Sequence, residues 1–457
     1  MSTTHRVVDV VVLGVGSGGE HVARKLGAAG LRVVAVESGL VGGECPFHGC
    51  TPSKLLIRAS DALAEARRAG ELGGKVDVQA SLGPAAQRVR ESTHDWHDDA
   101  HVDSLEEAGV RLVRGHGRLA GPGVVEVDAP GGLTRLVATR GVVLNTGTEP
   151  AVPPVDGLAG TPYWTNRDVL AISEAPVSLA LVGGGPIGVE LAQALRRFGT
   201  EVTIIEAGPR LLGPEEPEAG ELLAEVLRDE GVDVRTGAEL ARVTHDGEQF
   251  HLDVDGEQVV VERLLVATGR SENIHDIGLE TVGLDPGADH VEVDERMRAG
   301  ERLWAVGDIT GLGPWTHVSL YQGELAVRDA LGDTDGPWAD YRAVSRVTFT
   351  DPEVGAVGLT EAQAREQGID VVVGTADIGS DPRGWIHQAR GLVKVVADRQ
   401  TGVVVGATTM APYGGEVLGL LSTAVHAQVP VPVLRTMHFA YPTFHRTIEV
   451  ALRETGL

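Results

Sequence analysis

The two cysteines of this 457-residue chain lie close together in residues 42–50, which read GGECPFHGC. A chain that places both its thiols in one Cys-x4-Cys segment is suited to making and breaking a disulfide. A regular helix would separate Cys45 from Cys50 by ~7.5 Å along its axis, whereas a disulfide needs Cα atoms ~4.4–6.8 Å apart. Pro46 and Gly49 disfavour such a helix. We therefore expect a distorted helical turn around a redox-active pair.

Two glycine-rich turns, residues 14–19 and 183–188, each stand between a strand pattern and a helix pattern. Glycines at these positions let the backbone turn tightly and approach a pyrophosphate, which the N-terminus of the following helix attracts. Glu37 and Glu206 end the next strands, and each stands 23 positions after the first glycine of its turn. Each carboxylate is placed to accept hydrogen bonds from a ribose hydroxyl. The repeated spacing predicts two dinucleotide sites.

The acidic residue of the second site bears on the choice of nicotinamide nucleotide. A carboxylate at Glu206 would repel a 2′-phosphate, which favours NADH over NADPH, although the nearby Arg210 weakens this inference. The order of the sites suits FAD at the first turn and NADH at the second. Electrons would then pass from NADH through a flavin to the neighbouring disulfide.

Composition excludes several classes of partner. The net charge of −26, from 65 acidic and 39 basic side chains, disfavours nucleic acid and anionic membranes. No apolar run approaches the ~18 residues that a membrane span requires, and residues 1–6 carry no signal-peptide core. No group of His, Cys and Asp has the spacing of metal ligands, so no metal is expected. Two cysteines in so long a chain argue against secretion, and we expect a cytoplasmic protein.

These segments, together with others further along the chain, resemble those of the pyridine nucleotide-disulfide oxidoreductases. That family includes dihydrolipoamide dehydrogenase, glutathione reductase and mercuric reductase. The resemblance covers essentially the whole length. It rests on the Cys-x4-Cys-x-Pro-Ser-Lys segment, both glycine-rich turns, and a set of later matches. These are Thr146-Gly147, Thr268-Gly269-Arg270, Gly307-Asp308 and the run TFTDPEV at residues 348–354.

The resemblance implies an α/β fold with two Rossmann-like dinucleotide-binding domains and a C-terminal α+β dimerisation domain. Residues 1–150 and 273–340 would form a discontinuous FAD-binding domain, and 151–272 the NAD(P)-binding domain. Residues 341–457 would form the dimer interface of a homodimer. Within that last domain, the segment Gly384-Trp385-Ile386-His387 is expected to be a surface turn.

The resemblance also implies roles by position. Cys45 corresponds to the interchange thiol that meets the substrate, and Cys50 to the charge-transfer thiol against the flavin. Lys54 and Glu190 correspond to an ion pair beside the reactive flavin edge. The residues expected at FAD are Gly14, Gly16, Gly19, Glu37, Gly43, Lys54, Gly117, Thr146, Gly147, Asp308 and Thr316. Those expected at the nicotinamide nucleotide are Gly183, Gly185, Gly188, Glu190, Glu206 and Gly269.

The C-terminal segment departs from the family pattern His-Pro-Thr-x-x-Glu, whose histidine is the general base. Tyr441 stands at the base position and Arg446 where the glutamate would orient it. A tyrosine with a pKa near ~10 is a poor base at neutral pH. His445 or His438 could supply the base instead, or Arg446 could stabilise a thiolate directly.

Three functions remain open from the sequence, and two of them are favoured by particular residues. The intact cysteine pair favours a reductase that passes electrons to a small-molecule disulfide or another small acceptor. Tyr441 and Arg446 favour a quinone reductase or a nicotinamide nucleotide transhydrogenase, in which the cysteines are not needed. A redox-sensing flavoprotein has no feature of its own in the sequence. Mercuric reductases carry further cysteines near the chain end and often an N-terminal metal-binding domain, so mercury is not the acceptor we expect.

Overall fold

The computed structural model of the protein describes residues 4–457. They form two compact units. Unit 1 contains the described residues up to Pro52 with Arg88–Ala151 and Arg270–Asp340. Unit 2 contains Ser53–Gln87, Val152–Gly269 and Tyr341–Leu457. The three-domain division made from the sequence is finer than this and stays a prediction.

A mixed sheet forms the centre of unit 1, in the strand order β16-β17-β6-β1-β2-β3. Strand β1 pairs in parallel with both β2 and β6, so the strand order reverses beside it, as in a dinucleotide-binding domain. The path comprises β1 (Thr4–Leu13), β2 (Val33–Glu37), β3 (Arg111–Arg114), β6 (Gly132–Leu144), β16 (Arg298–Gly300) and β17 (Leu303–Ala305). Off it lie β4 (His116–Leu119) and β5 (Val124–Ala129), and β7 (Thr148–Pro150) pairs with β15 (Arg270–Glu272).

Strand β6 differs from the sequence prediction. The glycine and proline turns among residues 110–140 predict short strands, and the apolar run that begins at Gly141 predicts a separate strand, but β6 runs through both Arg140 and Gly141. Its first half pairs with β5 as well as β1, and a register shift in its pairing with β1 accommodates Gly141, whose φ is +156°. The glycine pattern thus marks an irregularity inside one strand rather than a boundary between two.

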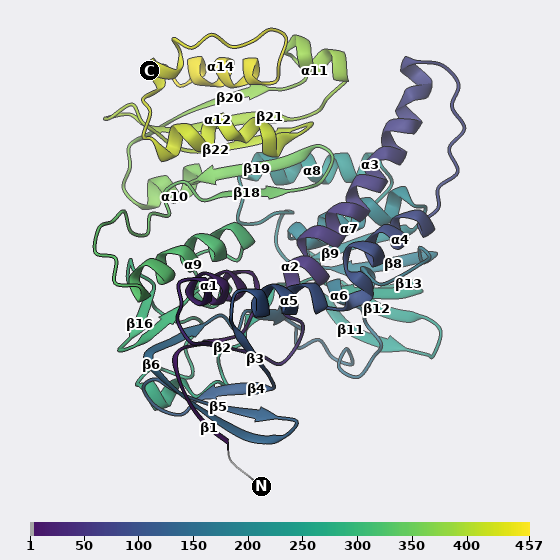
Figure 1. Cartoon of the computed structure of the whole chain (residues 1–457). Coiled ribbons are helices and arrows are strands. Elements are labelled where there is room, and N and C mark those ends of the chain that lie inside the picture. Colours follow the sequence, from purple (N-terminus) through teal and green to yellow (C-terminus); the bar gives the residue numbers. More distant parts are fainter. Residues whose placement is uncertain (1–3) are drawn as a thin grey trace. The chain divides into compact units, whose positions relative to one another are not determined.

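Two helices of unit 1 lie side by side, α1 (Ser17–Ala28) and α9 (Thr316–Ala330), as Figure 1 shows. Their close approach requires glycine, because a Cβ on Gly18 would stand 2.3 Å from Oγ of Ser319. Helix α5 (Asp99–Glu107) packs against β3 and α1. These contacts hold the N-termini of α1 and α9 in one unit with the cysteines.

The helix of the cysteine segment, residues 42–50, is interrupted as expected. Helix α2 (Glu44–Phe47) ends at Phe47, His48 has φ −134°, and α3 (Cys50–Leu72) begins at the second cysteine. The predicted distorted turn is therefore confirmed.

The nucleotide-binding part of unit 2 is built on a parallel sheet in the order β10-β9-β8-β14. Its elements are β8 (Ser178–Val182), α7 (Pro186–Arg197), β9 (Glu201–Glu206), α8 (Pro217–Asp229), β10 (Asp233–Thr236) and β14 (Arg263–Val266). The same unit contains an antiparallel sheet of β11 (Leu240–His245), β12 (Phe250–Val254) and β13 (Glu257–Val261), and helix α6 (Asn166–Val169). Helix α4 (Gly83–Ser92) begins in unit 2 and ends in unit 1.

The C-terminal part of unit 2 is an antiparallel sheet in the order β18-β19-β22-β21-β20, and α12 and α14 pack in its core. Its strands are β18 (Ser345–Thr348), β19 (Glu353–Gly358), β20 (Val371–Asp377), β21 (Leu392–Asp398) and β22 (Val404–Ala411). Its helices are α10 (Glu361–Glu366), α11 (Pro382–His387), α12 (Gly414–His426), α13 (Val431–Leu434) and α14 (His445–Glu454). The α/β fold with a C-terminal α+β part is confirmed.

The segment around Trp385 is a short helix, α11, so the prediction of a surface turn was wrong. The side chain of Asp381 accepts a hydrogen bond from the backbone N–H of Arg383, and Pro382 stands at the first helical position. His387 then packs against the ring of Phe444. In residues 4–457, no helix is both long enough and apolar enough to span a bilayer.

Candidate functional site

The first glycine-rich turn is built by close backbone contacts. Gly14 has φ +86°, a conformation that a side chain disfavours, and a Cβ on Gly19 would stand 2.2 Å from the carbonyl oxygen of Gly14. The N–H of Gly19 donates to Oδ1 of Asn145 at 2.8 Å, and the amide of Asn145 donates to the carbonyl of Val306 at 2.8 Å. Asn145 thus joins the turn to the carboxyl ends of β6 and β17.

Glu37 closes the same turn from the end of β2. Its carboxylate accepts the N–H of Val15 and the N–H of Gly39, both at 2.7 Å. On the far side, a Cβ on Gly43 would lie 2.9 Å from Cα of Gly16, so the turn and the start of the cysteine segment touch through backbone. These contacts place the first turn directly beside the thiols.

The residues present fit FAD. Gly16 precedes α1 and has no side chain to cap the helix, so the N–H groups of Ser17 and Gly18 remain available to a phosphate, while that of Gly19 donates to Asn145. The hydroxyl of Thr146 is buried without a hydrogen-bond partner among the described residues. Gly147 has φ +67° and open space where a Cβ would stand. A Cβ on Gly117 would stand 2.6 Å from Leu13 and 2.8 Å from Val36, so packing of the sheet requires this glycine, and its backbone contact to FAD stays a prediction.

A polar chain leads from Asp308 to the residue before Cys45. Burial raises the pKa of Asp308, and the hydroxyl of Thr148 donates to its carboxylate at 2.9 Å. Arg270 donates to Thr148 at 2.6 Å and lies 3.6 Å from the carboxylate of Glu44. The expected flavin ligand Asp308 is thereby linked to the cysteine segment.

The two thiols lie next to each other and are not joined by a disulfide in the structure. Cys45 is half-buried and Cys50 exposed. The hydrogen bond that Cys45 shares with Cys50, together with burial, raises the pKa of the Cys45 thiol well above its usual range, while Thr316 and Ser17 act to lower it. The hydroxyl of Thr316 lies 3.3 Å from the sulfur of Cys50. Because Thr316 opens the 15-residue helix α9, the positive end of that helix faces the sulfur atoms and favours a thiolate there.

The second glycine-rich turn repeats the first. Gly183 has φ +109°, and a Cβ on Gly188 would stand 2.1 Å from the carbonyl oxygen of Gly183. Glu206 accepts the N–H groups of Gly184 and Gly208, both at 2.5 Å. Gly185 has no described atom within 4 Å of its Cβ position and precedes the uncapped helix α7. Packing within the chain therefore does not require glycine there, whereas the close approach of a dinucleotide would.

Two other predicted residues of the sites lie in unit 2. Gly269 has φ +128° and open space around its Cβ position. Arg210, whose closeness weakened the case for NADH, donates through Nη2 to the carbonyl of Gly213 at 2.6 Å. Its guanidinium is thereby held within its own loop.

Lys54 and Glu190 form the ion pair that their positions suggested, with Nζ and Oε2 2.8 Å apart. Glu190 is 5% exposed and also accepts the N–H of Phe349 at 2.8 Å. The ammonium of Lys54 lies 4.7 Å from the centre of the Phe349 ring. The pair therefore joins α3 and α7 to the residue that follows β18.

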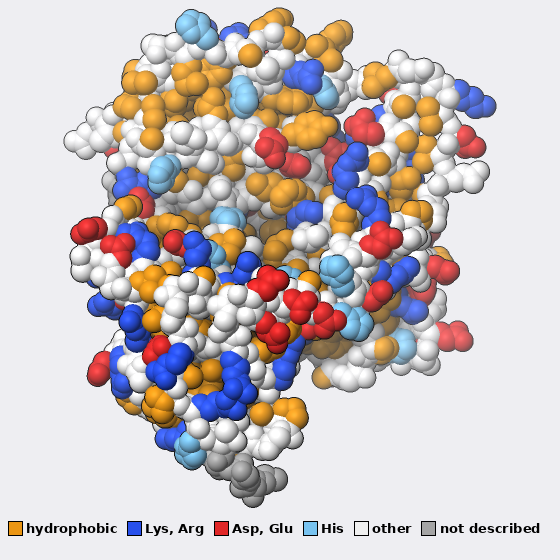
Figure 2. Space-filling model, in the orientation of Figure 1, with side chains coloured by type: hydrophobic (Ala, Val, Ile, Leu, Met, Phe, Trp, Pro, Cys, Tyr) orange, Lys and Arg blue, Asp and Glu red, His pale blue; other side chains and the backbone are white. Residues whose placement is uncertain are grey.

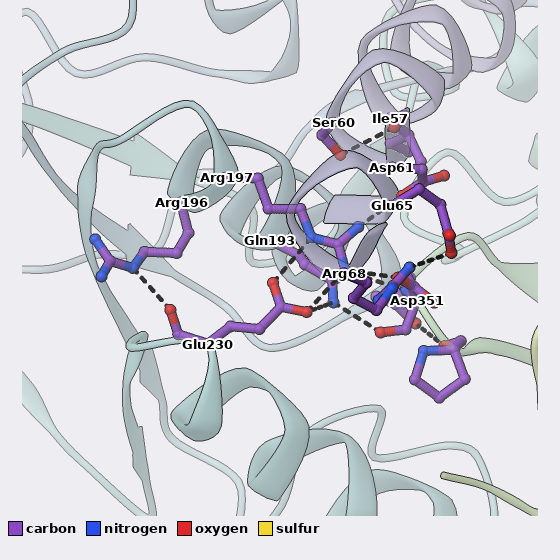
Figure 3. Close-up of polar contacts among 12 residues, drawn as sticks. Ile57, Ser60, Asp61, Glu65, Arg68, Gln193, Arg196, Arg197, Glu230 and Asp351 are labelled. Carbon is purple, nitrogen blue, oxygen red and sulfur yellow. Dashed lines mark hydrogen bonds and ion pairs between the residues drawn. The ribbon is translucent and has the colours of Figure 1, made fainter. Parts of the chain in front are cut away.

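Beyond this pair, α7 and α3 are joined by a cluster around Arg197, which is 3% exposed (Figure 3). Arg197 donates to Asp61 at 2.7 Å, to Asp351 at 2.8 Å and to both oxygens of Glu230. Gln193 exchanges two hydrogen bonds with the backbone of Asp351. Glu190, Gln193 and Arg197 lie on one face of α7, so the cluster fixes the helix that carries Glu190.

The sequence matches the pyridine nucleotide-disulphide oxidoreductase family over residues 8–325 and the dimerisation domain of that family over residues 344–452. The chain belongs to this family. It is therefore a flavoprotein oxidoreductase that uses FAD and a pyridine nucleotide. The presence of the dimerisation domain supports a homodimer.

Individual relatives match along the whole chain. A mercuric reductase of Streptomyces lividans is 33% identical over 99% of this chain and 97% of that protein. A mercuric reductase of Staphylococcus aureus is 31% identical over 97% of this chain and 81% of that protein.

Among solved structures, the HOCl-induced flavoprotein disulfide reductase RclA from Escherichia coli, in a Cu(II) complex, superposes with a TM-score of 0.85. It is 28% identical, with 98% of this chain and 99% of RclA covered. LpdA from Mycobacterium tuberculosis gives the same TM-score of 0.85 and 28% identity, again over 98% of this chain and 99% of LpdA.

The C-terminal segment of this oxidoreductase shows where its departures from the family pattern lie. Tyr441 is 70% exposed, and His445 begins α14. Arg446 forms an ion pair with Glu449, which also pairs with Arg453 at 2.5 Å. The guanidinium of Arg446 thus already has an anionic partner within its own helix, and the identity of the base stays a prediction.

Apolar side chains gather over the C-terminal domain in Figure 2. An exposed apolar patch of this kind marks an interaction surface, which agrees with a dimerisation domain. The most exposed large apolar residues of the C-terminal domain are Trp385, Ile386, Tyr413, Val433, Met437, Tyr441 and Val450.

Three residues of the sites were not foreseen from the sequence. Asn145 had a signal, since it immediately precedes Thr146 at the end of an apolar strand. Arg270 stood in a matched turn, but its partners Thr148 and Glu44 are distant in sequence. The buried Arg197 looked like an ordinary cation in the last turn of a helix.

The second turn yields a prediction that separates packing from binding. Gly185→Ala should leave the melting temperature unchanged but weaken nicotinamide nucleotide binding about tenfold, because its Cβ points into open space that the ligand would enter. Gly188→Ala should destabilise the fold by about 1–3 kcal/mol, because its Cβ meets backbone. Thermal melts and NADH titration check both; unchanged affinity in folded Gly185→Ala would contradict the assignment.

The Arg197 cluster yields a pH-dependent prediction. Burial raises the pKa of Asp61 to about 6, although Arg197 acts to lower it. A carboxyl whose pKa is raised by folding contributes stability below about pH 4, and that contribution is lost as the pH rises through about 6. The melting temperature of Asp61→Asn, relative to wild type, should therefore increase between about pH 4 and pH 7.

Asp77, which is exposed, provides the matched control. The difference between Asp77→Asn and wild type should stay flat over the same range. A flat difference for Asp61→Asn as well would show that its carboxyl is not perturbed.

Proposed function

We propose that this protein is an NADH-dependent reductase that passes electrons to the Cys45–Cys50 pair and then from Cys45 to a small acceptor. The observation that carries the proposal is the adjacency of the two thiols, next to the first glycine-rich turn and Thr316. FAD, when bound, supplies the exchange between a hydride donor and a disulfide. The remaining steps depend on side chains of this chain.

Several contacts support a relay through the thiols. The positive end of α9 favours negative charge near Cys50, which a thiolate requires. The hydrogen bond with Cys50 and burial raise the pKa of the Cys45 thiol, so a proton on Cys45 suits a thiolate on Cys50. A reduced pair of one thiol and one thiolate can then give up two electrons and one proton as the disulfide re-forms. These electrons can reduce one two-electron acceptor or two one-electron metal ions.

The acceptor class we favour is a thiophilic metal ion. Reduction of a disulfide substrate requires a general acid to protonate the leaving thiolate, and Tyr441 replaces the family's histidine. A metal ion bound by thiolates needs no such proton. Mercuric reductases and an RclA structure described as a Cu(II) complex are among the similar proteins. Because this chain has two cysteines in all, Cu(II) is the better candidate than mercury.

NADH is the proposed electron donor. The carboxylate of Glu206 stands at the end of β9 and would repel the 2′-phosphate of NADPH. Arg210 keeps its positive charge but is tied through Nη2 to the carbonyl of Gly213, so the choice of NADH rests on Glu206. The second nucleotide site therefore favours an unphosphorylated ribose.

A second candidate is a quinone reductase or transhydrogenase. It is favoured by Tyr441 and Arg446, which stand at the positions of the family's histidine and glutamate and so replace its general base. In this case electrons would leave the flavin without passing through Cys45.

The deciding experiment compares wild-type holoenzyme with Cys45→Ser, using NADH and four acceptors: Cu(II), Hg(II), a low-molecular-weight disulfide and a quinone. Cu(II) turnover should fall by a factor of about 1000 or more in Cys45→Ser, because no third thiol exists in the chain. Cys50→Ser should lose the same activity and the long-wavelength absorbance of a thiolate beside the flavin.

Quinone turnover provides the internal control. It should persist in both variants if quinones accept electrons from the flavin directly. Cu(II) turnover that survives in Cys45→Ser would contradict the relay and favour the second candidate.

A further inference from the structure

An unusual backbone conformation lies beside the cysteine segment. His94, Asp95 and Trp96 have φ values of +49°, +51° and +59°. The left-handed region is unfavourable for residues with a Cβ and is normally visited by single residues rather than by three in succession. Such strain persists only where surrounding contacts hold it, and it gathers at functional sites.

The last residue of the left-handed turn, Trp96, contacts the backbone between the two cysteines in sequence. The indole Nε1 of Trp96 donates to the carbonyl of Phe47 at 3.1 Å. Phe47 ends α2, so this carbonyl lies at the break between the helices that carry Cys45 and Cys50. The indole thus occupies an acceptor that the interrupted helix leaves open.

Asp98, two residues after Trp96, binds the chain on the N-terminal side of α2. Asp98 is buried, and its carboxylate accepts the N–H of Val41 at 2.6 Å and pairs with Arg114 at 2.5 Å. Val41 immediately precedes the two glycines that lead into α2. Asp98 therefore fixes the chain just before Cys45.

A ring completes the contact between these two points. His101 packs against the ring of Phe47 with centroids 5.6 Å apart, and its Nδ1 lies 3.0 Å from the carboxylate of Glu20 on α1. A Cβ on Gly42 would stand 3.0 Å from the same imidazole. Residues 94–101, here called the clamp segment, therefore contact the chain at Val41 and Gly42, before α2, and at Phe47, the last residue of α2.

We propose that the clamp segment positions Cys45 and Cys50 for disulfide formation, with Trp96 as the principal positioning residue. This inference rests on the proposed function, since it assumes that the pair cycles between dithiol and disulfide. A clamp that holds the break between α2 and α3 lowers the entropy lost when the sulfurs join. The left-handed turn is the local cost of aiming the indole at Phe47.

The test measures the thiol–disulfide equilibrium of holoenzyme in buffers of reduced and oxidised dithiothreitol, with thiol trapping as the readout. In each exchange the protein disulfide takes two electrons and two protons from the dithiol reagent, which becomes the cyclic disulfide. Trp96→Phe keeps an aromatic ring but removes the indole N–H donor together with the pyrrole ring. The equilibrium constant for forming the Cys45–Cys50 disulfide should fall by up to about tenfold, the range for one hydrogen bond, because the dithiol state of the variant is less ordered before the sulfurs join.

Trp304→Phe is the matched control. Trp304, in β17, also donates its indole N–H, but to a partner outside the cysteine segment, the carboxylate of Asp329 at 2.9 Å. It should lower the melting temperature without moving the thiol–disulfide equilibrium. His101→Gln tests the clamp independently and should also lower the equilibrium constant for disulfide formation. It keeps the proposal testable if Trp96→Phe fails to fold.

The outcomes distinguish the two levels of the argument. If the wild type forms no Cys45–Cys50 disulfide at any buffer ratio, the proposed function fails. If the wild type forms it but Trp96→Phe and His101→Gln match the control, the clamp is overturned and the proposed function stands.

Discussion

The close approach of two sulfur atoms is the constraint on which the rest of the site depends. Cys45 and Cys50 cannot meet within a regular helix, so the chain breaks between α2 and α3 at His48 and Gly49. A break of this kind exposes backbone polar groups and loses local stability. The surrounding contacts from α1, α5 and α9 compensate by fixing both sides of the break in unit 1.

The two nucleotide sites use one physical device twice. In each, a carboxylate at the end of the second strand accepts two N–H groups, one from the glycine-rich turn and one from its own loop. Each turn also precedes a helix without a side-chain cap. The ordered turn and the first N–H groups of the helix suit a pyrophosphate, and the two sites differ in that Asn145 accepts one of these N–H groups, that of Gly19, at the first.

Much of this could be predicted from sequence because its causes are local. The glycine spacing, the following acid and the proline and glycine around the cysteines each act within a few residues, and they predicted both turns and the helical break. The division at Gly141 and the turn at Trp385 were wrong because sheet pairing and an aspartate cap overrode local glycine signals. Asn145, Arg197 and Trp96 were missed because their partners lie far away in sequence.

Reductive titration of the anaerobic holoenzyme tests the central claim most directly, because it counts the electrons that the protein can hold. A flavin together with a redox-active Cys45–Cys50 pair should take up about four electrons per subunit, and Cys45→Ser about two. An uptake of about two electrons by the wild type, unchanged in Cys45→Ser, would contradict the account, because the sulfur pair would then stand outside the electron path.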